Sequence, residues 1–135
     1  MTFRVIAVLA LGMVGALLGG VHLLAHHSLA SQFDEGKPLT LQGVITKVEW
    51  VNPHVYVHID VKDNSGTTEQ WSLETLPPAT LRKGGLRSDM LGKGEMVTVL
   101  AYRARNDSKL AFLRKITFAD GREIVVWVGD IKTAK

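Results

Sequence analysis

The chain has 135 residues, no cysteine and a formal net charge of +3. This length suits a single domain, and the absence of cysteine excludes disulfides, thiolate metal sites and a cysteine nucleophile. A charge balance this mild gives no electrostatic argument for a nucleic-acid partner, so none is expected.

The first 25 residues have the layout of an export signal. Arg4 is the charged side chain that precedes residues 5–21, an uncharged stretch rich in Leu, Val, Ala and Gly. A basic start before an apolar core is typical of a signal peptide, and we predict cleavage after Ala25. The alternative is an uncleaved anchor, because residues 5–21 reach the lower limit of about 17 residues for a membrane-spanning helix. Both interpretations place the rest of the chain outside the cytoplasm, in a periplasm.

Residues 26–38 are expected to form a polar lead-in, residues 39–129 the folded domain and residues 130–135 a frayed tail. The phase of the apolar residues changes between Leu41 and Val44, which predicts a bulge or bend at Gly43. A long first strand that bends at a glycine can serve two sheets of a small barrel.

The remaining strand patterns are separated by turn signals. Strands are expected at residues 39–51, 54–62, 67–74, 95–103, 110–118 and 122–128. Pro77-Pro78 can open a short helix between the third and fourth strands, and Gly84-Gly85 can close it. This order predicts an all-β fold, specifically a small OB-like barrel of five or six strands with one short helix.

The second expected strand carries the clearest functional pattern. Apolar and polar residues alternate from position 54 to position 61, so the two sets lie on opposite faces of the strand. The polar set is His54, Tyr56, His58 and Asp60. The turn before it contains Asn52-Pro53, which requires a cis peptide bond in a two-residue loop and not in a longer one. The sequence does not choose between these loops.

Several ordered motifs of the chain resemble those of a known family. They are His26-His27-Ser28, Phe33-Asp34, Gly43-Val44, Val48-Glu49-Trp50, Asn52-Pro53-His54 and Gly94-Glu95-Met96-Val97. The chain is similar over residues 26–123 to uncharacterised exported bacterial proteins catalogued as domain of unknown function 6152. The resemblance implies an exported protein of this architecture, and it implies no particular activity.

The histidines that follow the predicted cleavage point suggest a metal site. If cleavage follows Ala25, His26 becomes the terminus, and its amine and imidazole can chelate one ion together with a further imidazole. Planar nitrogen sets of this kind suit Cu(II) better than Zn(II). His54 and His58 lie about 13 Å apart along one strand, too far to share an ion easily. The expected metal ligands are therefore His26, His27 and His54, with copper as the first candidate and zinc as the second.

The alternative is a metal-free barrel that recognises a periplasmic protein or a small ligand. Its ligand-binding residues would be Tyr56, His58 and Trp50, because OB-type barrels bind through this face and aromatic rings stack on ligands. Trp50 shares its phase with Val48, which favours packing in the core over display on the binding face. If the apolar start is retained, the chain would be a membrane-anchored subunit of a larger complex. No pair of carboxylates has a spacing that assigns acid and base roles, so we expect a non-enzymatic binding or accessory module.

Overall fold

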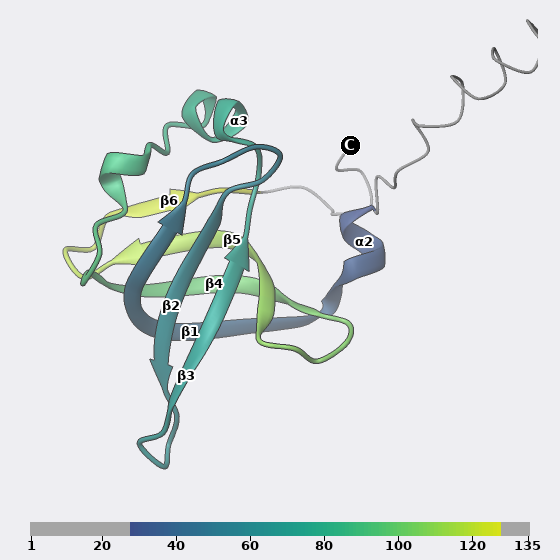
Figure 1. Ribbon diagram of the computed structural model, residues 1–135, viewed down its shortest axis with the longest axis vertical. Helices are drawn as coiled ribbons and strands as arrows, with labels where there is room; N and C mark the ends of the chain where they lie inside the picture. Colours follow the sequence, from purple (N-terminus) through teal and green to yellow (C-terminus); the bar gives the residue numbers. More distant parts are fainter. Residues whose placement is uncertain (1–27, 128–135) are drawn as a thin grey trace, which may run out of the picture.

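The computed structural model describes residues 28–127, which form a six-stranded sheet and short helical segments (Figure 1). The strands are β1 (Phe33–Glu49), β2 (Tyr56–Lys62), β3 (Thr68–Glu74), β4 (Met96–Ala104), β5 (Leu110–Phe118) and β6 (Glu123–Val125). The helices are α2 (Leu29–Gln32), α3 (Pro78–Lys83) and the 3-10 helix η1 (Ser88–Met90). The predicted all-β class is confirmed. Within the described residues, no helix is long and apolar enough to cross a membrane.

The strand order β3-β2-β1-β4-β5-β6 brings the two ends of the sheet toward each other. All neighbouring strands in this order are antiparallel, and β3 also pairs in parallel with β5. The parallel pairing joins Ser72–Glu74 to Leu110–Phe112 and partly closes the strands into a ring. α3 and η1 lie in the connection between β3 and β4, as expected for the short helix.

The long strand β1 serves both parts of the ring. It pairs with β4 from Phe33 to Val44 and with β2 from Gly43 to Glu49, so the two pairings overlap at Gly43 and Val44. A Cβ atom at Gly43 would lie 2.5 Å from the carbonyl oxygen of Asp60. Only glycine therefore lets β2 approach β1 this closely.

The bulge expected at Gly43 lies further along the chain. The pairing of β1 with β2 shifts register between Ile45 and Lys47. Ile45 is buried in the core, and Leu41 before the shift and Val48 after it both pack against that core. The apolar residues change phase because of this extra residue, whereas Gly43 stays within the regular ladder.

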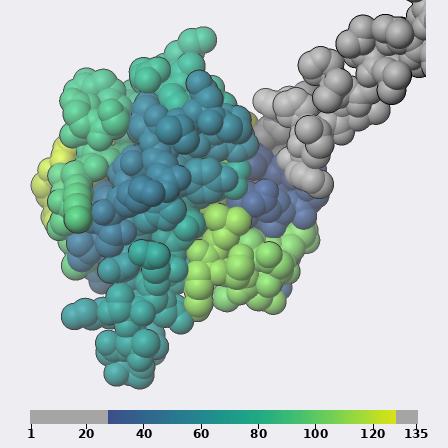
Figure 2. Space-filling view, in the orientation of Figure 1, coloured from purple at the N-terminus to yellow at the C-terminus, as the bar shows by residue number. Residues whose placement is uncertain are grey.

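β1 begins at Phe33, within the segment expected to be a lead-in, rather than at residue 39. The reason is a second buried cluster beside the main core, formed by Phe33, Tyr102, Ala104 and Phe112. Phe33 pairs with Ala104, and its ring centroid lies 5.6 Å from that of Phe112. Leu29 and Ala30 of α2 pack against this cluster from outside. Figure 2 shows α2 lying against the connection between β4 and β5.

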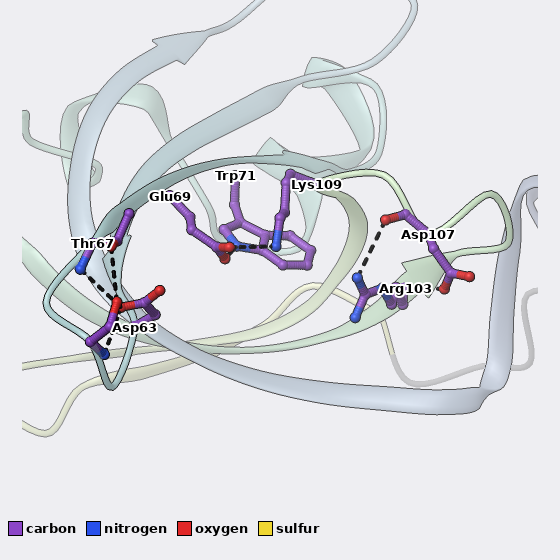
Figure 3. Close-up of polar contacts among 8 residues, drawn as sticks. Asp63, Thr67, Glu69, Trp71, Arg103, Asp107 and Lys109 are labelled. Carbon is purple, nitrogen blue, oxygen red and sulfur yellow. Dashed lines mark hydrogen bonds and ion pairs between the residues drawn. The ribbon is translucent and has the colours of Figure 1, made fainter.

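Trp71 of β3 is buried in the main core and is covered by charged side chains (Figure 3). Lys109 Nζ lies 5.1 Å and Arg103 Cζ 5.6 Å from the centroid of the indole ring. Lys109 also pairs with Glu69 at 2.7 Å, and Arg103 pairs with Asp107 at 3.5 Å. We call Glu69, Trp71, Arg103, Asp107 and Lys109 the Trp71 group. Its charges neutralise one another around one aromatic ring.

Candidate functional site

The second strand separates its two faces as the alternation predicts. Val55, Val57 and Ile59 are fully buried. The side chains of His54 and His58, on the opposite face, are 35% and 18% exposed. The strand β2 itself begins at Tyr56, after a turn in which the Asn52–Pro53 peptide bond is cis.

Backbone hydrogen bonds hold His54 beside the end of β3. Val55 N–H donates to the carbonyl oxygen of Leu76 at 3.2 Å, and Thr75 N–H donates to that of Val55 at 2.9 Å. This continues the β2–β3 ladder past Tyr56, which pairs with Glu74. The imidazole of His54 is thereby brought next to the carboxylate of Glu74.

Glu74 is the centre of the site. Its side chain is 5% exposed, and its Oε1 lies 2.5 Å from Nδ1 of His54. Its Oε2 accepts a hydrogen bond from Nε2 of Gln32, in α2, at 3.4 Å. A buried carboxylate needs such partners, because an unpaired charge away from water is costly. The second ring nitrogen of His54, Nε2, has no hydrogen-bond partner among residues 28–127.

Tyr56 lies between two carboxylates on the same face. Burial raises the pKa of its phenol to about 12, and the charge of Glu74, hydrogen bonding to Glu74 and the charge of Glu49 act in the same direction. The phenol therefore stays neutral at ordinary pH. Its ring stacks on that of His58, with centroids 6.5 Å apart and planes at 19°.

His58 has neighbours on both sides of its ring. Nδ1 lies 3.0 Å from the hydroxyl oxygen of Ser72, whereas Nε2 lies 3.4 Å from Oε1 of Glu49, is buried and forms no hydrogen bond within residues 28–127. Lys47 forms a hydrogen bond with the same carboxylate and is the main reason that the pKa of Glu49 is lowered. His58 is thus fixed within the surface of the sheet, in contrast to the half-exposed His54.

The structure brings together some of the predicted site residues. Tyr56 and His54 lie in one cluster around Glu74, which was not predicted, and the ring of His58 stacks on that of Tyr56. Trp50 packs instead against the main core, with Arg82 Cζ 5.9 Å from its ring centroid. His26 and His27 lie outside the described residues. In the part of the chain that the structure describes, no three His, Asp or Glu residues are placed to hold a metal ion.

The sequence reasoning missed the partners of these histidines. Glu74 was only one carboxylate among several, and Gln32, Ser72 and Glu49 received no role. The register of the β2–β3 hairpin supplies a signal for two of them, because Lys62 pairs with Thr68 across the turn. Counting back from that pair places Glu74 opposite Tyr56 and Ser72 opposite His58.

The fold and this cluster define a small all-β protein with a carboxylate-held histidine on the outer face of β2 and β3. The chain belongs to a family described as "Family of unknown function (DUF6152)", whose model matches residues 16–112. The comparison with curated proteins finds no match.

Proposed function

We propose that the protein is an exported, non-enzymatic module that binds Cu(II) through His54 together with His26 and His27. The observation that carries this proposal is the contact between the nearly buried carboxylate of Glu74 and the half-exposed imidazole of His54. Histidines that ligate metals commonly donate their other ring N–H to a carboxylate, which fixes the ring and makes the ligating nitrogen more basic. Here Glu74 holds Nδ1 at 2.5 Å, so Nε2 is the nitrogen available to a metal.

One imidazole does not make a site, and the other ligands would come from the start of the mature chain. The described chain begins at Ser28, directly after His27. Gln32, four residues further on, touches the carboxylate that holds His54. About 4.5 Å of helix and two residues of at most about 3.6 Å each separate Gln32 from His27. A terminal amine and imidazoles form the tetragonal nitrogen set that Cu(II) prefers, with Zn(II) as the weaker candidate.

The architecture and compartment are part of the same proposal. The order β3-β2-β1-β4-β5, the parallel β3–β5 pairing and the helix before β4 support an OB-like barrel. The apolar residues 5–21 support export to a periplasm. Proteins of this architecture commonly bind through the face that carries the cluster.

The test is a Cu(II) titration of protein matured by an exporting host, with its terminus sequenced. We expect one ion per chain and nitrogen hyperfine structure in the electron paramagnetic resonance spectrum. His54→Ala should weaken binding at least about tenfold, the lower end of the cost of disturbing a ligand's outer partner. His58→Gln should have a smaller effect, because both nitrogens of His58 face other side chains. Correctly cleaved protein that takes up neither Cu(II) nor Zn(II) would overturn the proposal.

A metal-free role has one specific observation in its favour. The described residues contain no complete ligand set, while the stacked rings of Tyr56 and His58 form an aromatic surface beside His54. Such a surface would recognise a periplasmic protein or a small ring-shaped ligand. If the apolar start is retained, the module would be a membrane-anchored subunit of a larger complex. Metal-free protein that still binds its partner, and loses it in Tyr56→Ala, would favour this role.

A further inference from the structure

The first half of β1 has an open edge. Residues Pro38–Val44 pair with β4 on one side, whereas the pairing with β2 on the other side begins only at Gly43. Within residues 28–127, no strand pairs with the second edge of Leu39–Gln42. Natural sheets usually cover such an edge or place charged side chains on it, because it can pair with another chain. Leu39–Gln42 contain no charged residue, so this stretch of the edge is unprotected.

The backbone groups of Thr40 point toward this edge. Ile45 N–H donates to the carbonyl oxygen of Glu95 at 2.9 Å, on the β4 side of β1. The N–H and C=O groups of successive strand residues point alternately to the two edges, so those of Gly43 and Leu41 also face β4. The N–H and C=O of Thr40, which has the opposite phase, therefore face the open edge, where an added strand can bond to them.

A hollow of about 650 Å³ lies along this edge, in the fork between β1 and the β2–β3 hairpin. Figure 1 shows the hairpin projecting past the point where β1 turns away from it. The lining includes Leu41, Val44, Asp60, Lys62, Thr68 and Met96. Met96 is 44% exposed and is one of three large apolar side chains displayed on the surface of the described chain. An added strand can therefore bury an apolar side chain in this hollow.

Two charged side chains of the hollow lack partners. Asp60 is half-buried and Lys62 is exposed, and neither side chain forms an ion pair or a hydrogen bond within residues 28–127. A carboxylate that is partly removed from water is stabilised by a cation that donates hydrogen bonds to it. The ammonium of Lys62 is hydrated already, so Asp60 is the group that favours a partner of opposite charge.

We propose that the fork is a docking site for an extended segment of a partner protein, which adds as a strand to the open edge of β1. Strand addition takes its affinity from main-chain hydrogen bonds and its specificity from pockets for alternate side chains. Here an apolar side chain of the segment packs in the hollow, and a basic side chain pairs with Asp60. None of the proposed metal ligands takes part, so this inference is independent of Cu(II) binding.

The probes are short synthetic peptides, capped at both ends, in which Val and Thr alternate and one central Thr is kept or replaced by Lys or Glu. They are titrated into the full chain, purified from an exporting host, while nuclear magnetic resonance follows the amides of Leu39–Gln42. We expect saturable shifts of these amides at peptide concentrations up to about 1 mM. The Lys peptide should bind about two- to fivefold more tightly than the Thr peptide, as expected for an opposite-charge pair across two strands, and the Glu peptide more weakly. No saturable shift with any of the three peptides would overturn the proposal.

N-methylation tests whether the peptide pairs through its backbone. Two versions of the Lys peptide carry N-methyl groups on alternate amides, so each version is blocked along a different edge. Only one version should lose binding, because the added strand bonds to β1 along a single edge. Equal binding by the two versions would overturn strand addition.

Variants of the protein test the charge. Asp60→Asn should abolish the preference for the Lys peptide over the Thr peptide, and a preference that survives would overturn the role of Asp60. Asp89→Asn removes the same charge outside the hollow, where its partner is Arg87, and should leave the preference unchanged. A dimer in sedimentation that the peptide does not dissociate would assign the edge to a second copy. Binding gained only after removal of residues 128–135 would assign it to the chain's own tail, and either result would overturn the proposal.

Discussion

Two sets of polar side chains lie on opposite faces of β3. They differ in whether all their polar groups have partners within the described residues. In the Trp71 group, Glu69 is satisfied by Lys109, whose ammonium also covers the indole ring. Arg103 covers the same ring and pairs with Asp107. Every charge of this group has an opposite charge beside it, and Asp107 also pairs with Lys37 from outside the group at 3.7 Å.

The set around Glu74 is arranged differently. Its carboxylate is nearly buried, receives Gln32 and His54, and raises the pKa of Tyr56. Its contacts fix one nitrogen of His54 and leave the other without a partner among the described residues. We infer that the Trp71 group mainly stabilises the fold, and we propose that the Glu74 set serves recognition. The predictions below test this division.

The largest expected effect is on stability. Trp71→Ala removes a buried aromatic side chain and should lower the free energy of unfolding by about 3–5 kcal/mol. Trp50→Ala should lower the free energy of unfolding by clearly less, because Trp50 is only half-buried. Urea denaturation followed by circular dichroism measures both. Similar losses in the two variants, or weaker Cu(II) binding by folded Trp71→Ala protein, would contradict the proposed division.

The second prediction concerns Cu(II) affinity instead of stability, and here the Glu74 set should be the sensitive one. Glu74→Gln keeps the shape of the side chain but removes the charge that holds His54, and should weaken Cu(II) binding by about 10–100-fold. Glu69→Gln makes the same change five residues earlier on the same strand, within the Trp71 group on the opposite face. It should leave the dissociation constant unchanged in a calorimetric titration. Equal effects in the two variants would mean that Glu74 has no special relation to the metal.

The sequence predicted the faces of β2 but not the partners across the sheet. Period two placed His54, Tyr56 and His58 together because neighbouring side chains of a strand point to opposite sides. Glu74 required the hairpin register, which the turn at Asp63–Gly66 sets. Gln32 lay beyond prediction, since its contact depends on how α2 packs against the Phe33 cluster.

The position of the bulge in β1 was also beyond prediction, because it depends on how the strands pair. The change of hydrophobic phase was visible in the sequence, but the bulge that produces it does not lie at the glycine. Gly43 is required by the close approach of Asp60, whereas the extra residue lies between Ile45 and Lys47. Apolar periodicity records that a phase changes, and only the pairing of the strands fixes where.

The third prediction concerns pH. The pKa of Tyr56 is about 12 in the folded protein, against an ordinary value of 10.0. The neutral phenol is therefore favoured by folding, so its contribution to stability is complete below pH 10 and is lost as the pH rises toward 12. Absorbance at alkaline pH should show a late-titrating tyrosine that disappears in Tyr56→Phe. Glu74→Gln should shift that titration to lower pH, and an unshifted curve would exclude Glu74 as a cause.

The smallest expected effect lies in the Trp71 group. Lys109→Ala removes the ammonium above the indole ring and should lower the free energy of unfolding by about 0.5–1 kcal/mol through the lost cation–π contact. Lys115→Ala is the matched control, because Lys115 pairs with Glu123 much as Lys109 pairs with Glu69, and no aromatic contact of Lys115 occurs in the described chain. Equal losses in both variants would remove the aromatic ring from the explanation.

The stability lost in Lys109→Ala should depend on pH, and the pKa of Glu69 sets the direction of that dependence. Its pKa lies below the usual 4.5, mainly because Lys109 donates a hydrogen bond to it. The pair therefore contributes fully above pH 4.5, and this contribution fades as the pH falls through the lowered pKa. The stability difference between the unmodified protein and Lys109→Ala should thus shrink on acidification, leaving the part due to the ring. A difference that is the same at pH 7 and at acid pH would show that the ion pair contributes nothing, and that the cation acts on Trp71 alone.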